Sequence, residues 1–300
     1  MNLIKPKSLK KGDTIGFLTI SGPVENIEKV ENAKKYFEEQ GYNVIISDTT
    51  YTQKGFLAAD DEVRLAQLHE FFADNEIDAI ICTRGGYGAI RLLGKIDYNL
   101  IKKKPKIFAG FSDITAFLTV FTTNCGLKTF HSPMPCFNFG EEKVSDITST
   151  SFFQTLTSNE TFKTPLDGEI YNKGLSKGIL WGGNLATLAS MDGLNFVPDE
   201  AFILFLEDVN EPAYKVDRYL TQLMFDKKFK KNISGIVLGN FSNLDDKTLF
   251  DEIFYELGKK TNIPIISGLK TGHIQEQITI PLGVTVELNT QTKELKEILV

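Results

Sequence analysis

The sequence predicts an α/β protein with two domains: an N-terminal Rossmann-like domain built on a parallel sheet, and a smaller mixed α/β C-terminal domain. Three observations support this prediction. The 300 residues exceed the usual size of a single domain. In the first half, short apolar runs alternate with segments of helical periodicity. A polar stretch then leads into a second half with a different pattern. We place the domains at residues 1–155 and 170–300, joined by a linker at 156–169.

The N-terminal domain is predicted from apolar runs and the amphipathic segments between them. The runs predict strands at 14–20, 43–47, 79–84, 106–111 and 127–132. Helices are expected at 24–40, 60–74, 113–124 and about 145–157, with a short helix ending at Leu93. Gly41 closes the first helix at its C′ position. Strands separated by helices of this length predict a parallel sheet covered on both faces.

The C-terminal domain shows shorter and more varied segments. Strands are expected at 169–174, 176–183, 201–208, 233–239, 264–269 and 284–289. Helices are expected at 184–191, 213–226 and 246–260. These short segments of both kinds predict a second, mixed α/β domain.

Composition excludes several classes of protein. The formal net charge of −6 gives no sign of nucleic-acid binding. The first residues, MNLIKPKSLKKGD, lack the apolar region of a secretory signal peptide, and apolar runs such as AFILFL are far too short to span a membrane. The three cysteines have no CxxC spacing and are typical of reduced thiols. We therefore expect a cytoplasmic protein without a membrane partner.

No motif points to a metal or cofactor. The histidines at 69, 131 and 273 are far apart and lack ligand spacing, so no metal site is expected. The glycine-rich stretch GGYG (85–88) lacks the lysine of a P-loop and the spacing of a dinucleotide fingerprint. This absence argues against a nucleotide-dependent oxidoreductase. The missing signal peptide argues against a ligand-binding protein of the periplasmic type.

Polar and glycine residues directly follow the predicted strands. Open parallel sheets bind ligands outside the carboxyl ends of their strands, so these positions are the candidates for a site. They are Ser21-Gly22-Pro23, Arg84-Gly85-Gly86, Ser112-Asp113, His131-Ser132, Glu207-Asp208 and Gly239-Asn240.

Ser112 stands in the stretch AGFSDIT (109–115), where a predicted strand turns into a helix. A serine at such a position is most often a helix N-cap, a role that Asp113 could share. The alternative is a nucleophile on a tight turn. A serine hydroxyl reacts only when a base removes its proton and a third group orients that base.

Several residues could supply the base and the acid. His131 ends a strand of the same domain, and His273 lies in a loop beside glycine, whereas His69 lies within a helix. The acid could be Glu207 or Asp208. The order Ser…acid…His occurs among known catalytic triads, but spacing alone does not establish that such groups meet.

Four blocks of the sequence carry a family resemblance. They are ICTRGGYGAIRLL (81–93), KIFAGFSDITAF (106–117), the segment from WGGNLATL to YKVDRYLTQL (181–223) and TGHIQEQITIPLG (271–283). With these blocks the chain resembles the LD-carboxypeptidase family of serine peptidases, which also includes the microcin C immunity proteins. One departure is Ser132 in FHSPM, where the family pattern has glycine, and this puts the local loop shape in doubt.

The resemblance implies a catalytic triad and a location for it. Ser112 is the nucleophile, His273 its base, and Glu207 the acid that orients His273. Because these residues come from both domains, the active site is expected in the cleft between them. We expect the N–H of Asp113, at a helix start, to bind the oxyanion together with an N–H of Gly85 or Gly86.

Arg84 is a candidate for binding the substrate's free carboxylate, since arginine binds carboxylates bidentately. A structural salt bridge is an equally acceptable interpretation of this residue.

The resemblance also implies a substrate. The enzyme would hydrolyse the amide bond to the terminal D-alanine of a murein tetrapeptide, in peptidoglycan recycling, without a cofactor and as a homodimer. The alternative is an immunity-type hydrolase that cleaves a toxic aminoacyl-nucleotide. That activity calls for an aromatic shelf for adenine, which Trp181 could provide, although a packing role beside two glycines is the simpler interpretation.

Overall fold

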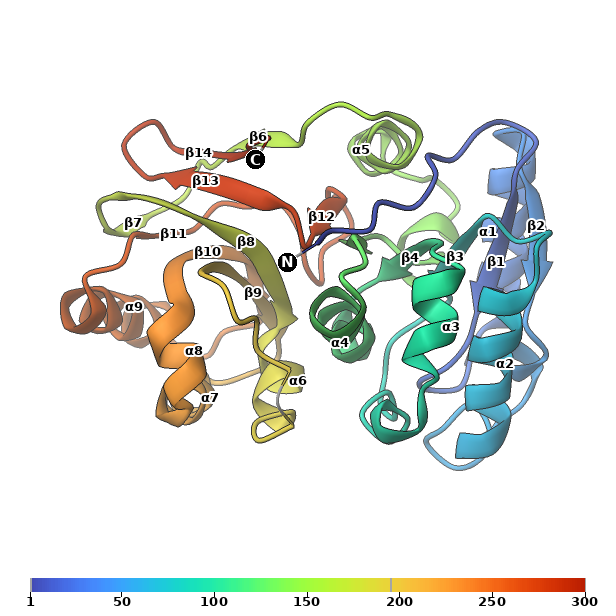
Figure 1. The fold of residues 1–300 in the computed structure, drawn as a ribbon, viewed down its shortest axis with the longest axis horizontal. Helices are drawn as coiled ribbons and strands as arrows, with labels where there is room; N and C mark the ends of the chain where they lie inside the picture. Colours follow the sequence, from blue (N-terminus) through green and yellow to red (C-terminus); the bar gives the residue numbers. More distant parts are fainter. Residues whose placement is uncertain (1, 195, 300) are drawn as a thin grey trace. The chain divides into compact units, whose positions relative to one another are not determined.

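The computed structural model describes residues 2–194 and 196–299, which form two compact units (Figure 1). The N-terminal unit comprises Asn2–Glu160 together with Gln275–Pro281. The C-terminal unit comprises Thr161–Ile274 and Leu282–Val300 within the described residues. A segment near the end of the chain therefore belongs to the N-terminal unit.

The N-terminal unit contains a six-stranded sheet with the order β12-β5-β4-β3-β1-β2. Its strands are β1 (Thr14–Leu18), β2 (Asn43–Ile46), β3 (Ala79–Cys82), β4 (Ile107–Gly110), β5 (Thr129–His131) and β12 (Ile280–Leu282). Strands β1 to β5 pair in parallel. The order reverses between β1 and β3, which makes this pair the switch point of a doubly wound sheet.

Helices cover both faces of this sheet. They are α1 (Ile27–Glu39), α2 (Asp61–Ala73), α3 (Tyr98–Lys103), α4 (Thr115–Cys125) and α5 (Asp146–Thr157). On one face, α1 and α5 bury Phe37 and Phe152 against the side chains of Ile15 and Phe17 in β1. On the other face, Phe72 of α2 and Phe121 of α4 pack on Phe108 of β4. Each strand contributes side chains to the cores on both faces of the sheet, because successive side chains point to opposite faces.

The C-terminal unit contains an eight-stranded mixed sheet with the order β6-β14-β13-β8-β9-β10-β11-β7. Its strands are β6 (Lys163–Pro165), β7 (Ile170–Asn172), β8 (Leu175–Asn184), β9 (Phe202–Val209), β10 (Ile233–Ser242), β11 (Ile265–Ile266), β13 (Thr285–Asn289) and β14 (Glu294–Glu297). The central strands β8 to β11 are parallel, and antiparallel strands flank them. Helices α6 (Leu185–Ser190), α7 (Ala213–Phe225), α8 (Lys227–Asn232) and α9 (Lys247–Thr261) gather along one side of this sheet in Figure 1.

The predicted fold class is confirmed, and most elements lie where the sequence predicts them. The short helix ending at Leu93 is wrong, because turns follow Gly88 and only a 3-10 turn forms at Leu93–Lys95. Within the stretch expected as a linker, Lys163–Pro165 forms the edge strand β6, which pairs with β14. The sequence reasoning also missed α3, α8, β12 and β14, which are all six residues or shorter.

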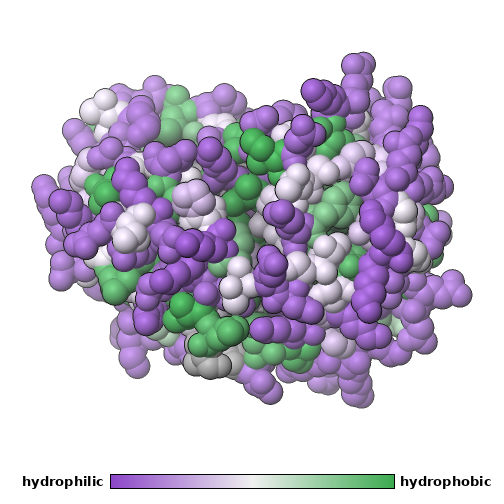
Figure 2. All heavy atoms as spheres, turned by 90° about the horizontal axis from the view of Figure 1, so that it is seen from above, coloured by the Kyte–Doolittle hydropathy of each residue, from purple (hydrophilic) through white to green (hydrophobic). Residues whose placement is uncertain are grey.

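Hydrophilic residues cover most of the face that Figure 2 shows, and hydrophobic side chains appear there in separate groups. Among residues 2–194 and 196–299, no helix is both long enough and apolar enough to cross a bilayer.

Candidate active site

The loops that follow β1, β3 and β4 come together at the switch point of the N-terminal sheet. The N–H of Gly22, after β1, donates to the carbonyl oxygen of Gly85, after β3, over 3.1 Å. Ser21 donates its hydroxyl to the carboxylate of Asp113, after β4, over 2.7 Å. Adjacent strands therefore bring these polar positions into contact, at the edge where doubly wound sheets bind ligands.

Ser112 has a left-handed backbone, with a φ of 65°. Such a conformation is uncommon for a residue other than glycine and indicates a constrained turn. The expected capping role is wrong. The N-cap of the 3-10 turn Ser112–Ile114 is Phe111, that of α4 is Ile114, and neither makes a side-chain cap bond. An N-cap residue has an extended backbone, and Ser112 does not. The serine is thus held in this turn for another reason.

Gly85 lies directly against Ser112. A Cβ added at Gly85 would come within 2.7 Å of the Ser112 Cβ, 2.8 Å of its Oγ and 3.3 Å of the Asp113 nitrogen. An approach below 3.0 Å would force a shift, so only glycine fits here without movement of Ser112 or the loop. The neighbouring Gly86, with a φ of 119°, packs in the same way on the backbone of Gly22. The serine hydroxyl, the Asp113 N–H and the glycine loop therefore share one small region.

The side chain of Asp113 links three loops. Its Oδ2 accepts hydrogen bonds from Ser21 Oγ and, over 2.9 Å, from the N–H of Ala89. Burial raises the pKa of Asp113, and these two hydrogen bonds together with the charge of Arg64 oppose the rise. Sequence reasoning gave the Asp113 side chain only a helix-capping role and missed that its carboxylate binds Ser21 and Ala89.

Arg84 makes a salt bridge with Glu25, with Nη1 and Oε1 3.0 Å apart, and Nη1 also donates to the carbonyl oxygen of Pro23. The Glu25 side chain is 82% exposed. The structure thus shows the salt bridge, which was one of the two interpretations of Arg84.

In the C-terminal unit, Glu207 and His273 form a hydrogen-bonded pair. Nδ1 of His273 donates to Oε2 of Glu207 over 2.7 Å. Glu207 ends the apolar part of β9 and is fully buried, whereas His273 follows β11 in a loop and is 15% exposed. A Cβ at Gly272, whose φ is 124°, would lie 3.0 Å from Oε2 of Glu207. Glycine at 272 therefore allows the histidine loop to approach the carboxylate.

The pKa of His273 is raised above its usual value. Burial lowers the pKa by disfavouring the charged ring, but the hydrogen bond that His273 donates to Glu207 and the negative charges of Glu207 and Asp208 outweigh burial. A carboxylate that stabilises the protonated ring in this way is what a histidine needs in order to accept a proton during a reaction.

Asp208 points to the opposite side of β9 from Glu207, as neighbouring residues in a strand must. Its carboxylate accepts hydrogen bonds from the side chain of Asn184 over 2.8 Å and from the N–H of Ala186 over 2.9 Å, at the start of α6. Burial first, and then the charge of Glu207, raise the pKa of Asp208 to about 6. The carboxylate beside the histidine is therefore Glu207.

The remaining candidates have structural roles. Nε2 of His69 accepts from the N–H of Asp97 over 3.0 Å, and the fully buried His131 packs its ring beside Phe111. Trp181 is fully buried, and its ring contacts those of Phe196, Phe202 and Phe229. The interpretation of Trp181 as a shelf for adenine is therefore wrong, because a ligand cannot stack on a ring enclosed in the core.

Comparisons with known proteins agree with these features. A family model for the LD-carboxypeptidase N-terminal domain matches residues 15–132, and one for the C-terminal domain matches residues 177–288. The chain is 36% identical to a probable murein peptide carboxypeptidase of Bacillus subtilis, over 96% of this chain and 92% of the relative. It is 28% identical to the microcin C7 self-immunity protein MccF of Escherichia coli, over 96% of this chain and 93% of MccF.

Solved structures give the same result. The muramoyltetrapeptide carboxypeptidase of Oxalobacter formigenes is similar with a TM-score of 0.83 and 30% identity, over 94% of this chain and 97% of that one. MccF in complex with aspartyl sulfamoyl adenosine is similar with a TM-score of 0.91 and 26% identity, over 99% of both chains. Since the two family models together match most of the sequence, this protein belongs to the LD-carboxypeptidase family and is a serine-type carboxypeptidase.

Proposed function

We propose that this protein hydrolyses the amide bond to the terminal D-alanine of murein tetrapeptides. The similarity to enzymes named for murein peptides supports the substrate class. The observation that carries the chemistry is the buried Glu207–His273 pair, because a histidine with a raised pKa on a buried carboxylate is a poised general base.

In the proposed reaction, Ser112 is the nucleophile and His273 its base. With its Nδ1–H bonded to Glu207, the neutral imidazole has its acceptor nitrogen at Nε2. Nε2 takes the Ser112 proton as the hydroxyl oxygen attacks the scissile carbonyl, and later returns that proton to the amine of the leaving D-alanine. Water then releases the acyl group from Ser112 by the reverse use of the same base. Glu207 stabilises the imidazolium in both steps.

The oxyanion of the tetrahedral intermediate needs donors beside the serine. We assign this role to the N–H of Asp113 and to an N–H of Gly85 or Gly86. The close approach of Gly85 to both Ser112 and the Asp113 nitrogen supports this assignment. Backbone donors held at fixed positions stabilise developing charge without having to reorganise.

We further propose that Arg84 binds the terminal carboxylate of the substrate. Its guanidinium lies close to the glycine loop, with Nη2 3.9 Å from a Cβ built at Gly86. Its partner Glu25 is mostly exposed, so a substrate carboxylate can replace it at small cost.

The similarity to MccF supports a second candidate, the hydrolysis of an aminoacyl-nucleotide amide. The chain has a single tryptophan, and its burial removes the residue that could have served as an adenine shelf. The murein peptide therefore remains the preferred substrate. We place the enzyme in the cytoplasm, as a homodimer acting on murein fragments during recycling.

Mass spectrometry can test the proposal directly. The protein is incubated with tetrapeptides ending in D-alanine, with either lysine or diaminopimelate at the third position, and with an isomer ending in L-alanine. We expect loss of one alanine from a D-ended peptide and much slower loss from the L-ended one. Equal cleavage of both isomers, or cleavage of an aminoacyl sulfamoyl adenosine alone, would contradict the proposed substrate.

A further inference from the structure

We propose that Arg64 and the carboxylate of Asp113 are positioning residues that hold the glycine loop Gly85–Ala89 against Ser112. The inference rests on the proposed function, because it concerns the loop to which we assign an oxyanion donor. It extends the site to α2, where no sequence motif indicates a functional residue.

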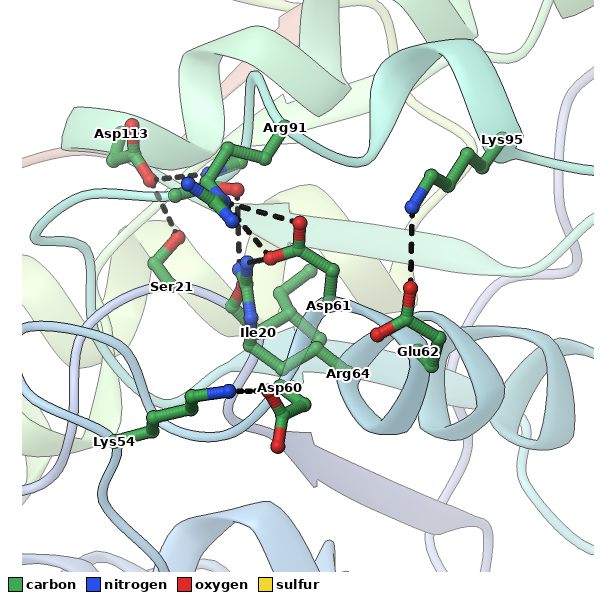
Figure 3. Close-up of polar contacts among 12 residues, drawn as sticks. Ile20, Ser21, Lys54, Asp60, Asp61, Glu62, Arg64, Arg91, Lys95 and Asp113 are labelled. Carbon is green, nitrogen blue, oxygen red and sulfur yellow. Dashed lines mark hydrogen bonds and ion pairs between the residues drawn. The ribbon is translucent and has the colours of Figure 1, made fainter.

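Arg64 is a fully buried arginine on α2 (Figure 3). Its Nη1 donates to the carbonyl oxygens of Ile20 and, over 3.1 Å, of Gly88. Its Nη2 donates to Oδ1 of Asp61 over 2.7 Å. Arg64 therefore joins the loop that follows β1 to the end of the glycine loop.

Asp61 completes the charge balance around Arg64. Arg91 also donates to both of its oxygens, over 2.9 and 3.1 Å. The hydrogen bond from Arg91 is the largest cause that lowers the pKa of Asp61 to about 2, and Arg64 adds to it. The carboxylate thus stays ionised as the counter-ion of the buried guanidinium.

Two side chains of opposite charge bind consecutive residues of the glycine loop. Arg64 binds the carbonyl oxygen of Gly88, and the Asp113 carboxylate binds the N–H of Ala89. Gly88 has a φ of 122°, and a Cβ there would lie 2.9 Å from Arg64 Nη1 and 2.5 Å from a methyl of Leu57. The loop is therefore fixed at this end by charged hydrogen bonds and close packing. Figure 3 labels the two charged side chains, Arg64 and Asp113.

The other end of the loop is the one that matters for chemistry. A Cβ built at Gly85 would lie 2.7 Å from the Ser112 Cβ, so this glycine lies close to the serine side chain. Glycine-rich segments have many accessible conformations, so an unsupported loop would hold its N–H groups loosely. An oxyanion donor is effective only at a fixed distance from the developing charge. Burying a guanidinium is also costly, and a well-packed apolar residue would serve stability as well or better. The contacts of Arg64 supply the reason for its presence.

The test compares Arg64→Met with a matched control, Lys106→Met. Lys106 is also a buried cation, and it binds the carbonyl oxygens of Phe71 and Asp74 at the other end of α2. Each variant loses a buried cation that lies on α2 or contacts it. Only Arg64, however, binds the glycine loop. Steady-state release of D-alanine is measured well below the melting temperature of each variant.

We expect Arg64→Met to lower kcat by about 10²–10³-fold, the usual effect of losing an oxyanion donor, with KM within about threefold. Arg64→Lys should recover part of this loss, and Lys106→Met should retain kcat within about threefold. Equal kcat values in Arg64→Met and Lys106→Met, or an effect of Arg64→Met confined to KM, would overturn the proposal.

Asp113→Asn provides a second variant should Arg64→Met fail to fold. It keeps the size of the side chain but removes the charge that strengthens the bond to Ala89. We expect a fall in kcat of about tenfold or more at unchanged KM, and an unchanged kcat would contradict the inference.

A substrate-independent measurement separates this inference from the proposed function. The rate at which a fluorophosphonate labels Ser112 should fall in Arg64→Met by the same order as kcat, and stay unchanged in Lys106→Met. Wild-type protein that is labelled at Ser112 but releases no D-alanine would contradict the substrate alone, and the labelling rates would still decide the role of Arg64. Absence of labelling at Ser112 would contradict both.

Discussion

Ser112 combines a left-handed backbone with a glycine packed on its side chain. Both features constrain the direction of the hydroxyl, and neither is needed for a helix cap. Gly85 has an ordinary backbone, so an alanine there would be excluded only by contact with Ser112. A substitution of Gly85 therefore tests the contact with Ser112 without adding backbone strain.

Gly85→Ala should abolish most activity while leaving the fold intact. The added methyl would lie 2.7 Å from the Ser112 Cβ, so either the serine or the loop must move. We expect kcat/KM to fall by at least about 10²-fold, as for misplacement of a reacting group. Gly94→Ala is the control, because a Cβ there meets no heavy atom of the described residues within 4 Å. Equal activity of the two variants would contradict the assignment of Ser112 and Gly85 to the active site.

Glu207→Gln tests the histidine through its pH dependence. The raised pKa of His273 comes from Glu207, so the neutral, active ring should appear only as the pH rises through that pKa. Replacing the carboxylate removes the charge that favours the protonated ring. The rate should fall by about 10⁴-fold, and the acidic limb of the kcat/KM profile should move to lower pH. A profile that stays in place would show that another carboxylate orients the base.

Arg84→Gln should raise KM and leave kcat nearly unchanged. Charged hydrogen bonds contribute about 1.5–3 kcal/mol, which predicts a rise in KM of about 10–100-fold. A substrate whose terminal carboxylate is amidated should bind the wild type and the variant alike. If Arg84→Gln binds the free acid as tightly as the wild type does, then Arg84 only forms its salt bridge with Glu25.

At the scale of the element, the residues of the proposed site lie at or just after strand ends: Ser112 and the glycine loop follow β4 and β3, and Glu207 lies near the carboxyl end of β9. The sequence shows where apolar strands end, so Ser112, Glu207 and the glycine loop could be identified. Residue spacing could not show which carboxylate faces His273, because Glu207 and Asp208 are chemically similar and the choice depends on the side of β9 that each occupies. Only the family resemblance indicated Glu207. A functional role for Arg64 could not be predicted, because a charged residue on an amphipathic helix is normally exposed.

Short elements were the least predictable. Strands β6, β12 and β14 have only three or four residues, too few to show an alternation of apolar and polar side chains. The wrong helix after Gly88 has a related cause. Its apolar residues suit a helical turn, but the hydrogen bonds to Arg64 and Asp113 hold the preceding loop in an irregular conformation.

Gly272→Ala tests the loop that carries His273. The residue has a φ of 124°, and a Cβ would lie 3.0 Å from Oε2 of Glu207. We expect a loss of stability of about 1 kcal/mol or more from the backbone and a fall in kcat/KM of at least about tenfold from the displaced pair. Gly12→Ala is matched, since its φ is 91° and a Cβ there has open space among the described residues. It should lose stability but keep activity, and similar activities would contradict this role of Gly272.

At the scale of the whole molecule, strand order decides which loops meet. The order β4-β3-β1 makes neighbours of Ser112, Gly85 and Gly22, which are far apart in the sequence. The alternation of strands and helices predicts a parallel sheet but not its order. Nor does any pattern predict that Gln275–Pro281 returns to the N-terminal unit after His273. The proposed triad takes Ser112 from one unit and Glu207 and His273 from the other, so its test must address their cooperation.

The most direct measurement is kcat/KM for D-alanine release by the wild type, Ser112→Ala, His273→Ala and the double variant. If Ser112 and His273 act as one catalytic unit, each single substitution should lower kcat/KM by about 10⁴–10⁶-fold. The double variant should then have about the same kcat/KM as the less active of the two single variants. Effects that multiply in the double variant, or a Ser112→Ala protein that keeps more than about a tenth of the wild-type activity, would contradict the account.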